Sequence, residues 1–100
     1  DGRNVMRSVY SLFRGEDEEK NLEKLQTAAD GSGSDQFYAA MYLGLFAEAK
    51  TQPEDARRWM ERAVASSYAL NSGDYMADLA RVHVDLRGWT SADKQAKKEL

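Results

Sequence analysis

The sequence contains no cysteine, one histidine, and no apolar run long enough to cross a bilayer. Without cysteine the chain can form neither disulfides nor thiolate metal sites. Its most apolar segment begins at Phe37 and ends at Glu48, whereas a membrane-spanning helix needs about 20 apolar residues. Strict alternation of apolar and polar residues is also missing over any useful length, so strands are not predicted. The pattern therefore favours an all-α protein without a transmembrane span.

The chain also lacks an excess of positive charge. Its formal net charge is −3, and nucleic-acid binding needs a clustered positive field. The glycine-rich turn at Gly31–Gly33 lacks the Lys-Ser/Thr of a phosphate loop, and no strand precedes it. Apolar residues make up 42% of the chain and charged residues 31%, which is typical of one small globular domain. We expect no nucleic-acid partner and no small-molecule substrate.

Residues that could form a catalytic or metal site are sparse. His83 has no cysteine or serine partner in a recognisable nucleophile motif. The segment "DGSGSD", Asp30–Asp35, resembles the start of a calcium loop, but the twelfth loop position holds Met41 instead of glutamate. The acidic run Glu16–Glu19 stands where a helix would begin and complements the positive end of the helix dipole. We therefore expect no catalytic residue, no metal and no cofactor.

Apolar residues recur at helical spacing through most of the chain, and glycine, serine and proline interrupt them. Gly15 and Gly88 are natural helix stops, Ser34 or Asp35 is the expected cap of the third helix, and Pro53 suits the first turn of the fourth. The segment 66–74 is expected to be a loop. The predicted helices are the five segments 4–14, 16–29, 37–50, 53–66 and 74–87.

Two of these helices carry specific expectations. The third is apolar on every side, so it must be covered from more than one direction. The fifth is expected to turn its large apolar residues inward, with Trp89 folding back on the bundle. The inward set predicted for the fifth helix is Tyr75, Met76, Leu79, Ala80, Val82 and Leu86. The tail 90–100 is expected to form a short polar helix, capped by Thr90 or Ser91, or to fray.

The third and fourth helices resemble one tetratricopeptide repeat, a helical hairpin of about 34 residues. Leu43 and Gly44 stand where that family has its Leu-Gly pair, and Ala56 and Ala63 occupy the two small positions of the second helix. Gly44 would let the two helices approach closely, and the alanines would keep the facing surface flat. The chain departs from the family pattern at four further positions: Met60 replaces the usual aromatic between the two alanines, and Ala40, Ala47 and Tyr68 hold the others.

The resemblance implies a short right-handed solenoid of stacked antiparallel hairpins. We expect one domain over residues 1–89 and a polar tail over 90–100. Within the domain, a degenerate hairpin covers 4–29, a tetratricopeptide-like hairpin covers 37–66, and a covering helix runs over 74–87.

A narrower likeness extends over most of the chain. The stretches "VMRSVYSLFRG", "DQFYAAMYLGLFAEA" and "DYMADLARVHVDLRGW" are similar to tetratricopeptide-like proteins that plants and algae direct to the chloroplast. This likeness implies a chloroplast location, peripheral association with thylakoid membranes, and a photosynthetic protein complex as partner. It also suggests that the chain begins at Asp1 because a transit peptide has been removed.

The function expected from these features is non-catalytic. We predict a protein–protein interaction module that docks on a larger complex or stabilises it. In the family, the first helix of each pair lines a concave binding surface, which here implies Tyr38, Met41, Leu45 and Glu48 as partner-binding residues. Arg81 could pair with an acidic group of the partner. Alternatively, Tyr38, Met41, Leu45 and Glu48 pack beneath the first and fifth helices, and Arg81 is a solvated surface charge.

Two further hypotheses remain open at this point. The chain could be a fragment of a longer repeat scaffold, in which more hairpins would continue the stack. It could also be an orphan enzyme that uses the carboxylates of Glu48 or Asp78.

Overall fold

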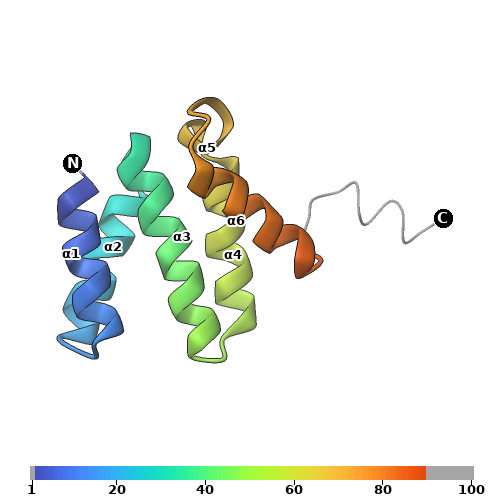
Figure 1. Cartoon of the computed structure of the whole chain (residues 1–100). Helices are drawn as coiled ribbons and strands as arrows, with labels where there is room; N and C mark the ends of the chain where they lie inside the picture. Colours follow the sequence, from blue (N-terminus) through green and yellow to red (C-terminus); the bar gives the residue numbers. More distant parts are fainter. Residues whose placement is uncertain (1, 90–100) are drawn as a thin grey trace.

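The computed structural model describes residues 2–89, and that part of the chain is helical without strands, which confirms the all-α prediction. It holds six helices rather than the five expected (Figure 1). The predicted tail 90–100 lies outside the described residues. The helices are α1 Gly2–Phe13, α2 Glu18–Ala29, α3 Gly33–Ala49, α4 Pro53–Ala65, α5 Ser67–Asn71 and α6 Tyr75–Leu86.

The long helices form two layers. In Figure 1, α1, α3 and α6 lie in the nearer layer, and α2 and α4 lie behind them. The helix pairs α1–α2 and α3–α4 are antiparallel neighbours, and the largest interface joins α3 to α4. Helix α3 also packs on α1 and α2, while α6 packs chiefly on α4. The apolar third helix is thus covered from several sides, as its sequence requires.

The same turn closes α1, α3 and α6. A residue with positive φ follows each helix: Gly15 at 81°, Thr51 at 60° and Gly88 at 71°. Its amide donates to the carbonyl three residues earlier, and the next amide donates to the carbonyl five residues earlier, all with N···O distances of 2.9–3.0 Å. This is the Schellman pattern of helix ends. After α1 and after α3, the turn sends the chain back as an antiparallel helix.

The close approach of α3 and α4 depends on Gly44. A Cβ atom added there would lie 2.9 Å from Cγ of Met60 and 3.2 Å from the carbonyl oxygen of Ala56. Ala56 and Ala63 are fully buried. The small residues therefore set the distance between the two helices, as the sequence predicted.

Two boundaries differ from the prediction. Helix α3 begins at Gly33, with Ser32 as N-cap, so the predicted caps Ser34 and Asp35 lie inside its first turn. Within the segment expected to be a loop, Ser66 caps the short helix α5 by accepting a hydrogen bond from the amide of Ala69. Five residues are too few to show helical periodicity, so only the capping serine marks this helix in the sequence.

Helix α6 has the predicted bounds within one residue, but its predicted orientation is wrong. Four of the six residues expected to face inward are exposed: Tyr75, Leu79, Val82 and Leu86. The buried face consists of Ala77, Ala80 and Val84 instead. Ala80 alone of the expected set is fully inward, and Met76 is half-buried. Small side chains let α6 lie close to α4, which turns the large side chains away from the core.

Candidate interaction surface

A shared carboxylate holds the start of α6. Asp74, its N-cap, accepts hydrogen bonds from the hydroxyl groups of Tyr38 on α3 and Tyr68 on α5, both at 2.5 Å. Its other oxygen accepts from the amide of Met76 at 2.8 Å. The bonds from the two tyrosines lower the pKa of Asp74, and burial together with the Asp74 carboxylate raises the pKa of Tyr38. Three helices meet at this one side chain.

An ion pair holds the other end of α6. Nη2 of Arg87 lies 2.8 Å from Oε1 of Glu48 on α3, and Nε of the same arginine donates to Oε2. Nε2 of His83 lies 3.4 Å from Glu48 Oε1. The hydrogen bonds from Arg87 hold the pKa of Glu48 below its usual range. With both ends tied to α3, the rotation of α6 about its own axis is set.

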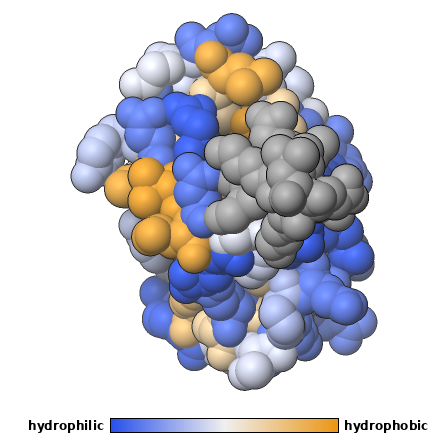
Figure 2. Space-filling model, turned by 90° about the vertical axis from the view of Figure 1, so that its right-hand side faces the viewer, coloured by the Kyte–Doolittle hydropathy of each residue, from blue (hydrophilic) through white to orange (hydrophobic). Residues whose placement is uncertain are grey.

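This rotation exposes an apolar face of α6. The α6 stripe comprises Tyr75, Leu79, Val82 and Leu86, whose exposed fractions are 70%, 41%, 51% and 77%. Residues spaced by four, three and four positions share one helix face. Figure 2 views the molecule from its α6 side and shows an apolar patch there among hydrophilic residues. A contiguous exposed patch of this kind marks a contact surface more often than isolated apolar residues do.

Arg81 is partly exposed, and its guanidinium also makes contacts within the protein. Its Nη1 donates to the carbonyl of Ala69 at 3.0 Å, which ties α6 to α5. Its Nη2 contacts Asp78 one turn earlier. The charged groups of Asp78, Arg81 and Asp85 border the α6 stripe on the same helix.

The predicted site residues on α3 do not form an open surface. Met41 is 2% exposed, so its side chain belongs to the core and not to an open surface. Leu45 is half-buried against the core. Tyr38 and Glu48 hold the two ends of α6, as described above. The α3 residues are largely covered, and the exposed apolar stripe lies on α6, three helices further along the chain.

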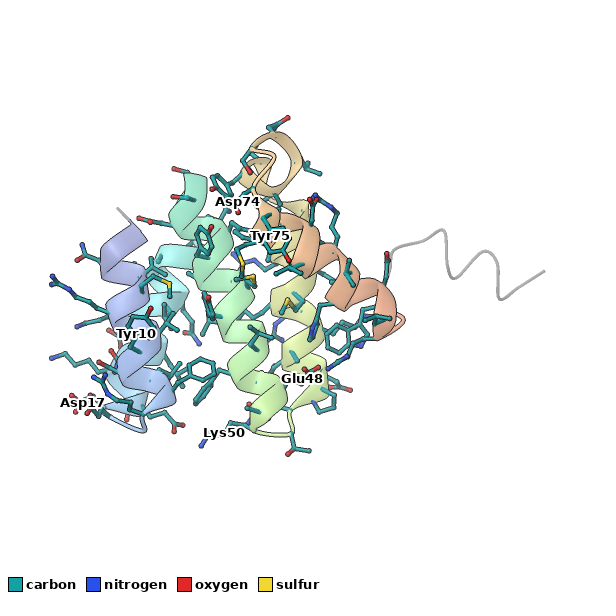
Figure 3. The ribbon with its side chains drawn as sticks, in the orientation of Figure 1. Tyr10, Asp17, Glu48, Lys50, Asp74 and Tyr75 are labelled. Carbon is teal, nitrogen blue, oxygen red and sulfur yellow. The ribbon has the colours of Figure 1, made fainter. Side chains whose placement is uncertain are left out.

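The α1 end of the molecule exposes less apolar surface than α6 does. Tyr10 and Phe13 are exposed on α1, and the Phe13 ring meets that of Phe46 edge-on at 5.5 Å. Figure 3 shows Tyr10 and Tyr75 on the same layer, far apart on α1 and α6. The outward residues of α2 are polar and charged: Glu18, Glu19, Lys20, Glu23, Lys24, Gln26 and Thr27. The two ends of the stack therefore differ, with a polar face at α2 and an apolar one at α6.

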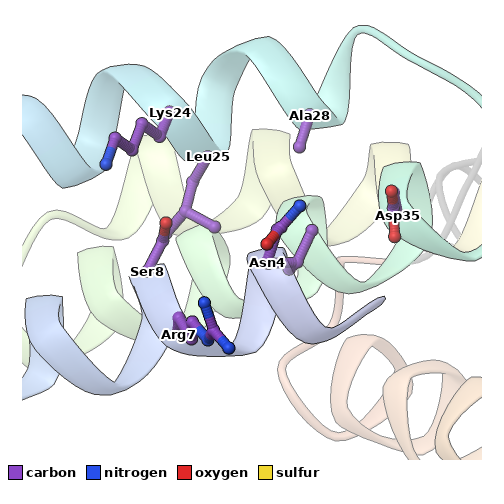
Figure 4. A pocket seen from close by; sticks show the side chains of 8 residues that line it. Asn4, Arg7, Ser8, Lys24, Leu25, Ala28 and Asp35 are labelled. Carbon is purple, nitrogen blue, oxygen red and sulfur yellow. The ribbon is translucent and has the colours of Figure 1, made fainter. Parts of the chain in front are cut away.

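A cleft between α1 and α2 holds no catalytic arrangement. It measures about 400 Å³, and its lining includes Asn4, Arg7 and Ser8 of α1, Lys24 of α2 and Asp35 of α3 (Figure 4). No nucleophile stands beside a base in it. Among the residues that the structure describes, no cluster of three or more potential metal ligands occurs. Nor is any helix within residues 2–89 long and apolar enough to span a membrane.

The carboxylates named for the enzyme hypothesis are both engaged in ion pairs. Glu48 is held by Arg87, and its lowered pKa keeps it ionised, which does not suit a proton donor. Asp78 is exposed and pairs with Arg81. The two side chains belong to different helices, and neither lines the cleft between α1 and α2.

Comparison with known proteins gives no relative. No protein-family model matches the chain, and no curated protein or solved structure is significantly similar to it. The resemblance to tetratricopeptide-like chloroplast proteins therefore stays a prediction from the sequence. The all-helical fold and the exposed α6 stripe are the findings on which a functional proposal can be built.

Proposed function

We propose that this chain is a non-catalytic protein–protein interaction module that docks on a larger protein complex or stabilises it, with the α6 stripe as its main contact surface. One observation carries the proposal: Tyr75, Leu79, Val82 and Leu86 share one helix face and are 41–77% exposed. Leaving large apolar side chains in water costs free energy that a partner surface recovers. Contact surfaces of this kind combine an apolar centre with a charged rim.

The way α6 is held suits recognition. The Asp74 cluster fixes the N-terminal end of the helix and the Glu48–Arg87 pair fixes the C-terminal end. A partner therefore meets a face that is already ordered, so little conformational entropy is lost on binding. The chemistry of the stripe suits an apolar helix face whose own residues recur every three or four positions.

A tetratricopeptide-like solenoid is the arrangement that we propose for the fold. Its support is the pairing of α1 with α2 and of α3 with α4, and the repeated helix-closing turn. Gly15 and Thr51 are 36 residues apart, and Thr51 and Gly88 are 37 apart, close to the repeat of about 34 residues in that family.

The proposed location is the chloroplast, with a thylakoid protein complex as partner. The proposed location and partner rest on the sequence likeness alone. It is tested by cross-linking mass spectrometry on intact thylakoids: the proposal expects cross-links from Lys50 or the tail lysines to subunits of one complex. Cross-links to proteins of another compartment would reject the location without rejecting the interaction module.

The interaction module itself is tested by affinity purification of the tagged full chain under mild detergent. We expect a partner in fixed stoichiometry, with the exposure of the α6 stripe to chemical labelling reduced in the complex. Recovery of the chain alone would overturn the proposal, as would a partner that leaves the stripe as accessible as in the free protein.

A further inference from the structure

Two cations in the cleft between α1 and α2 have no counter-ion among the described residues. Arg7 of α1 and Lys24 of α2 both line the cleft, and within residues 2–89 neither side chain forms an ion pair or a hydrogen bond. The other arginine side chains that the structure describes each pair with a carboxylate: Arg14, Arg57, Arg58, Arg62, Arg81 and Arg87. The cleft thus holds two uncompensated positive charges in a chain whose formal net charge is −3.

Neutral hydrogen-bond donors stand beside the cations. Asn4 lies three residues before Arg7 and four before Ser8, so the three side chains share one face of α1. The amide of Asn4 and the hydroxyl of Ser8 can both donate to an oxygen acceptor. The apolar part of the lining comes from Val5, Leu25 and Ala28. The cleft therefore offers an anion both charge and hydrogen bonds beside an apolar wall.

The one carboxylate of the lining lies away from the cations. Figure 4 shows Lys24, Ser8 and Arg7 at one end of the cleft and Asp35 at the other. An anion held at the cationic end would therefore lie far from Asp35, to which we assign no role in binding. The cleft volume of about 400 Å³ suits a small molecule, because such sites measure about 300–1,000 Å³.

We propose that the cationic end of this cleft binds the phosphate group of a small organic phosphate monoester, whose apolar part lies against Leu25. Charge selects this class of ligand. A phosphate monoester carries a charge of about −1.5 to −2 at neutral pH, which matches the two cations, whereas a single carboxylate matches only one. The Arg7 guanidinium can donate to two phosphate oxygens at once. Lys24 and Ser8 supply further donors from the facing helix and from α1.

The proposed phosphate site and the α6 stripe lie on different parts of the molecule. Helices α1 and α6 stand at opposite ends of the nearer layer (Figure 1). A phosphate bound between α1 and α2 would leave the stripe accessible to a protein partner. Neither proposal requires the other, so one can fail while the other holds.

NMR titration of the full chain with phenyl phosphate tests the proposal. We expect saturable shifts of amide signals of α1 and α2 around Ser8 and Leu25. Arg7→Gln and Lys24→Gln should each raise the dissociation constant at least about tenfold, because each removes a hydrogen bond between charged groups. The matched control is Lys20→Gln, which removes the same charge one turn earlier on α2, at an exposed and unpaired lysine outside the lining. It should change the dissociation constant by less than about twofold.

Benzoate is the matched ligand, because it joins a similar aromatic ring to a single negative charge. We expect it to bind at least about tenfold more weakly than phenyl phosphate. Equal affinity for the two ligands would overturn the proposal, and so would the absence of saturable shifts at about 10 mM phenyl phosphate. Equal weakening by Lys24→Gln and Lys20→Gln would also contradict it, because then the general field of α2 and not the cleft attracts the anion.

Discussion

The hydroxyl of Tyr38 on α3 donates a 2.5 Å hydrogen bond to the carboxylate of Asp74, 36 residues later at the N-cap of α6. The same carboxylate accepts from Tyr68 and from the amide of Met76. A residue that would ordinarily only cap a helix thus joins α3, α5 and α6. Because it fixes how α6 is rotated, it decides which side chains of α6 reach the solvent.

Tyr38→Phe should therefore weaken the docking of α6. Loss of a hydrogen bond to a charged group costs about 1.5–3 kcal/mol, and denaturant unfolding followed by circular dichroism measures it. Tyr10→Phe is the matched control, because Tyr10 is exposed on α1, and it should leave the free energy of unfolding unchanged. Equal effects of both substitutions would argue against the role assigned to Tyr38.

Stability should fall in acid because two carboxylates have lowered pKa values. The pKa of Glu48 is depressed mainly by its hydrogen bonds from Arg87, and that of Asp74 by the two tyrosines. A carboxyl whose folded pKa lies below its unfolded value stabilises the fold above the unfolded pKa, which is 4.5 for glutamate. That contribution is lost as the pH falls through the folded pKa.

The measurement is the melting temperature between pH 6 and pH 3. We expect it to decline in the unmodified chain and to decline less steeply in the double variant Glu48→Gln with Asp74→Asn. Parallel curves for the two proteins would show that other carboxylates govern the acid response.

Gly44→Val should destabilise the α3–α4 pair. The added Cβ would lie 2.9 Å from Cγ of Met60 and within 3.3 Å of two backbone atoms of α4, which cannot move aside readily. Overpacking of this kind costs about 1–3 kcal/mol. Ala49→Val, on the exposed end of the same helix, is the control and should cost much less. Chemical denaturation of the two variants provides the comparison.

Thr51→Gly should stabilise the protein. Thr51 is β-branched and holds a φ of 60°, a conformation that costs a side-chain-bearing residue about 1–2 kcal/mol and glycine almost nothing. After the entropic cost of glycine, a net gain of up to about 1 kcal/mol is expected. Thr27→Gly on the exposed face of α2 should instead destabilise by about that amount. A lower melting temperature for Thr51→Gly would contradict the prediction.

The helices could be predicted because their signals are local. Gly15, Pro53 and Gly88 mark starts and stops, and the small residues Gly44 and Ala56 mark the closest helix contact. Helix α5 was not predicted because it is shorter than two turns. Its one sequence signal is Ser66, a capping residue that also suits an ordinary loop.

The orientation of α6 could not be read from its sequence. Its large apolar residues, such as Leu79 and Leu86, form the more hydrophobic face, and a hydrophobic pattern usually points to the core. The pattern cannot distinguish a face that the chain buries itself from one that it offers to a partner. The orientation of α6 is set by two tertiary contacts, the Tyr38–Asp74 hydrogen bond and the Glu48–Arg87 pair. Their partners are 36 and 39 residues apart in the sequence.

The most direct test of the account is a comparison of two double variants that add the same charge. Leu79→Lys with Leu86→Lys alters the α6 stripe, and Gln26→Lys with Thr27→Lys alters the polar face of α2. We predict that both retain the melting temperature of the unmodified chain to within a few degrees, since all four sites are exposed. Only the stripe variant should fail to recover the partner in affinity purification. Undiminished recovery by a folded stripe variant would contradict the account, and so would its unfolding, which would show that the stripe serves the core.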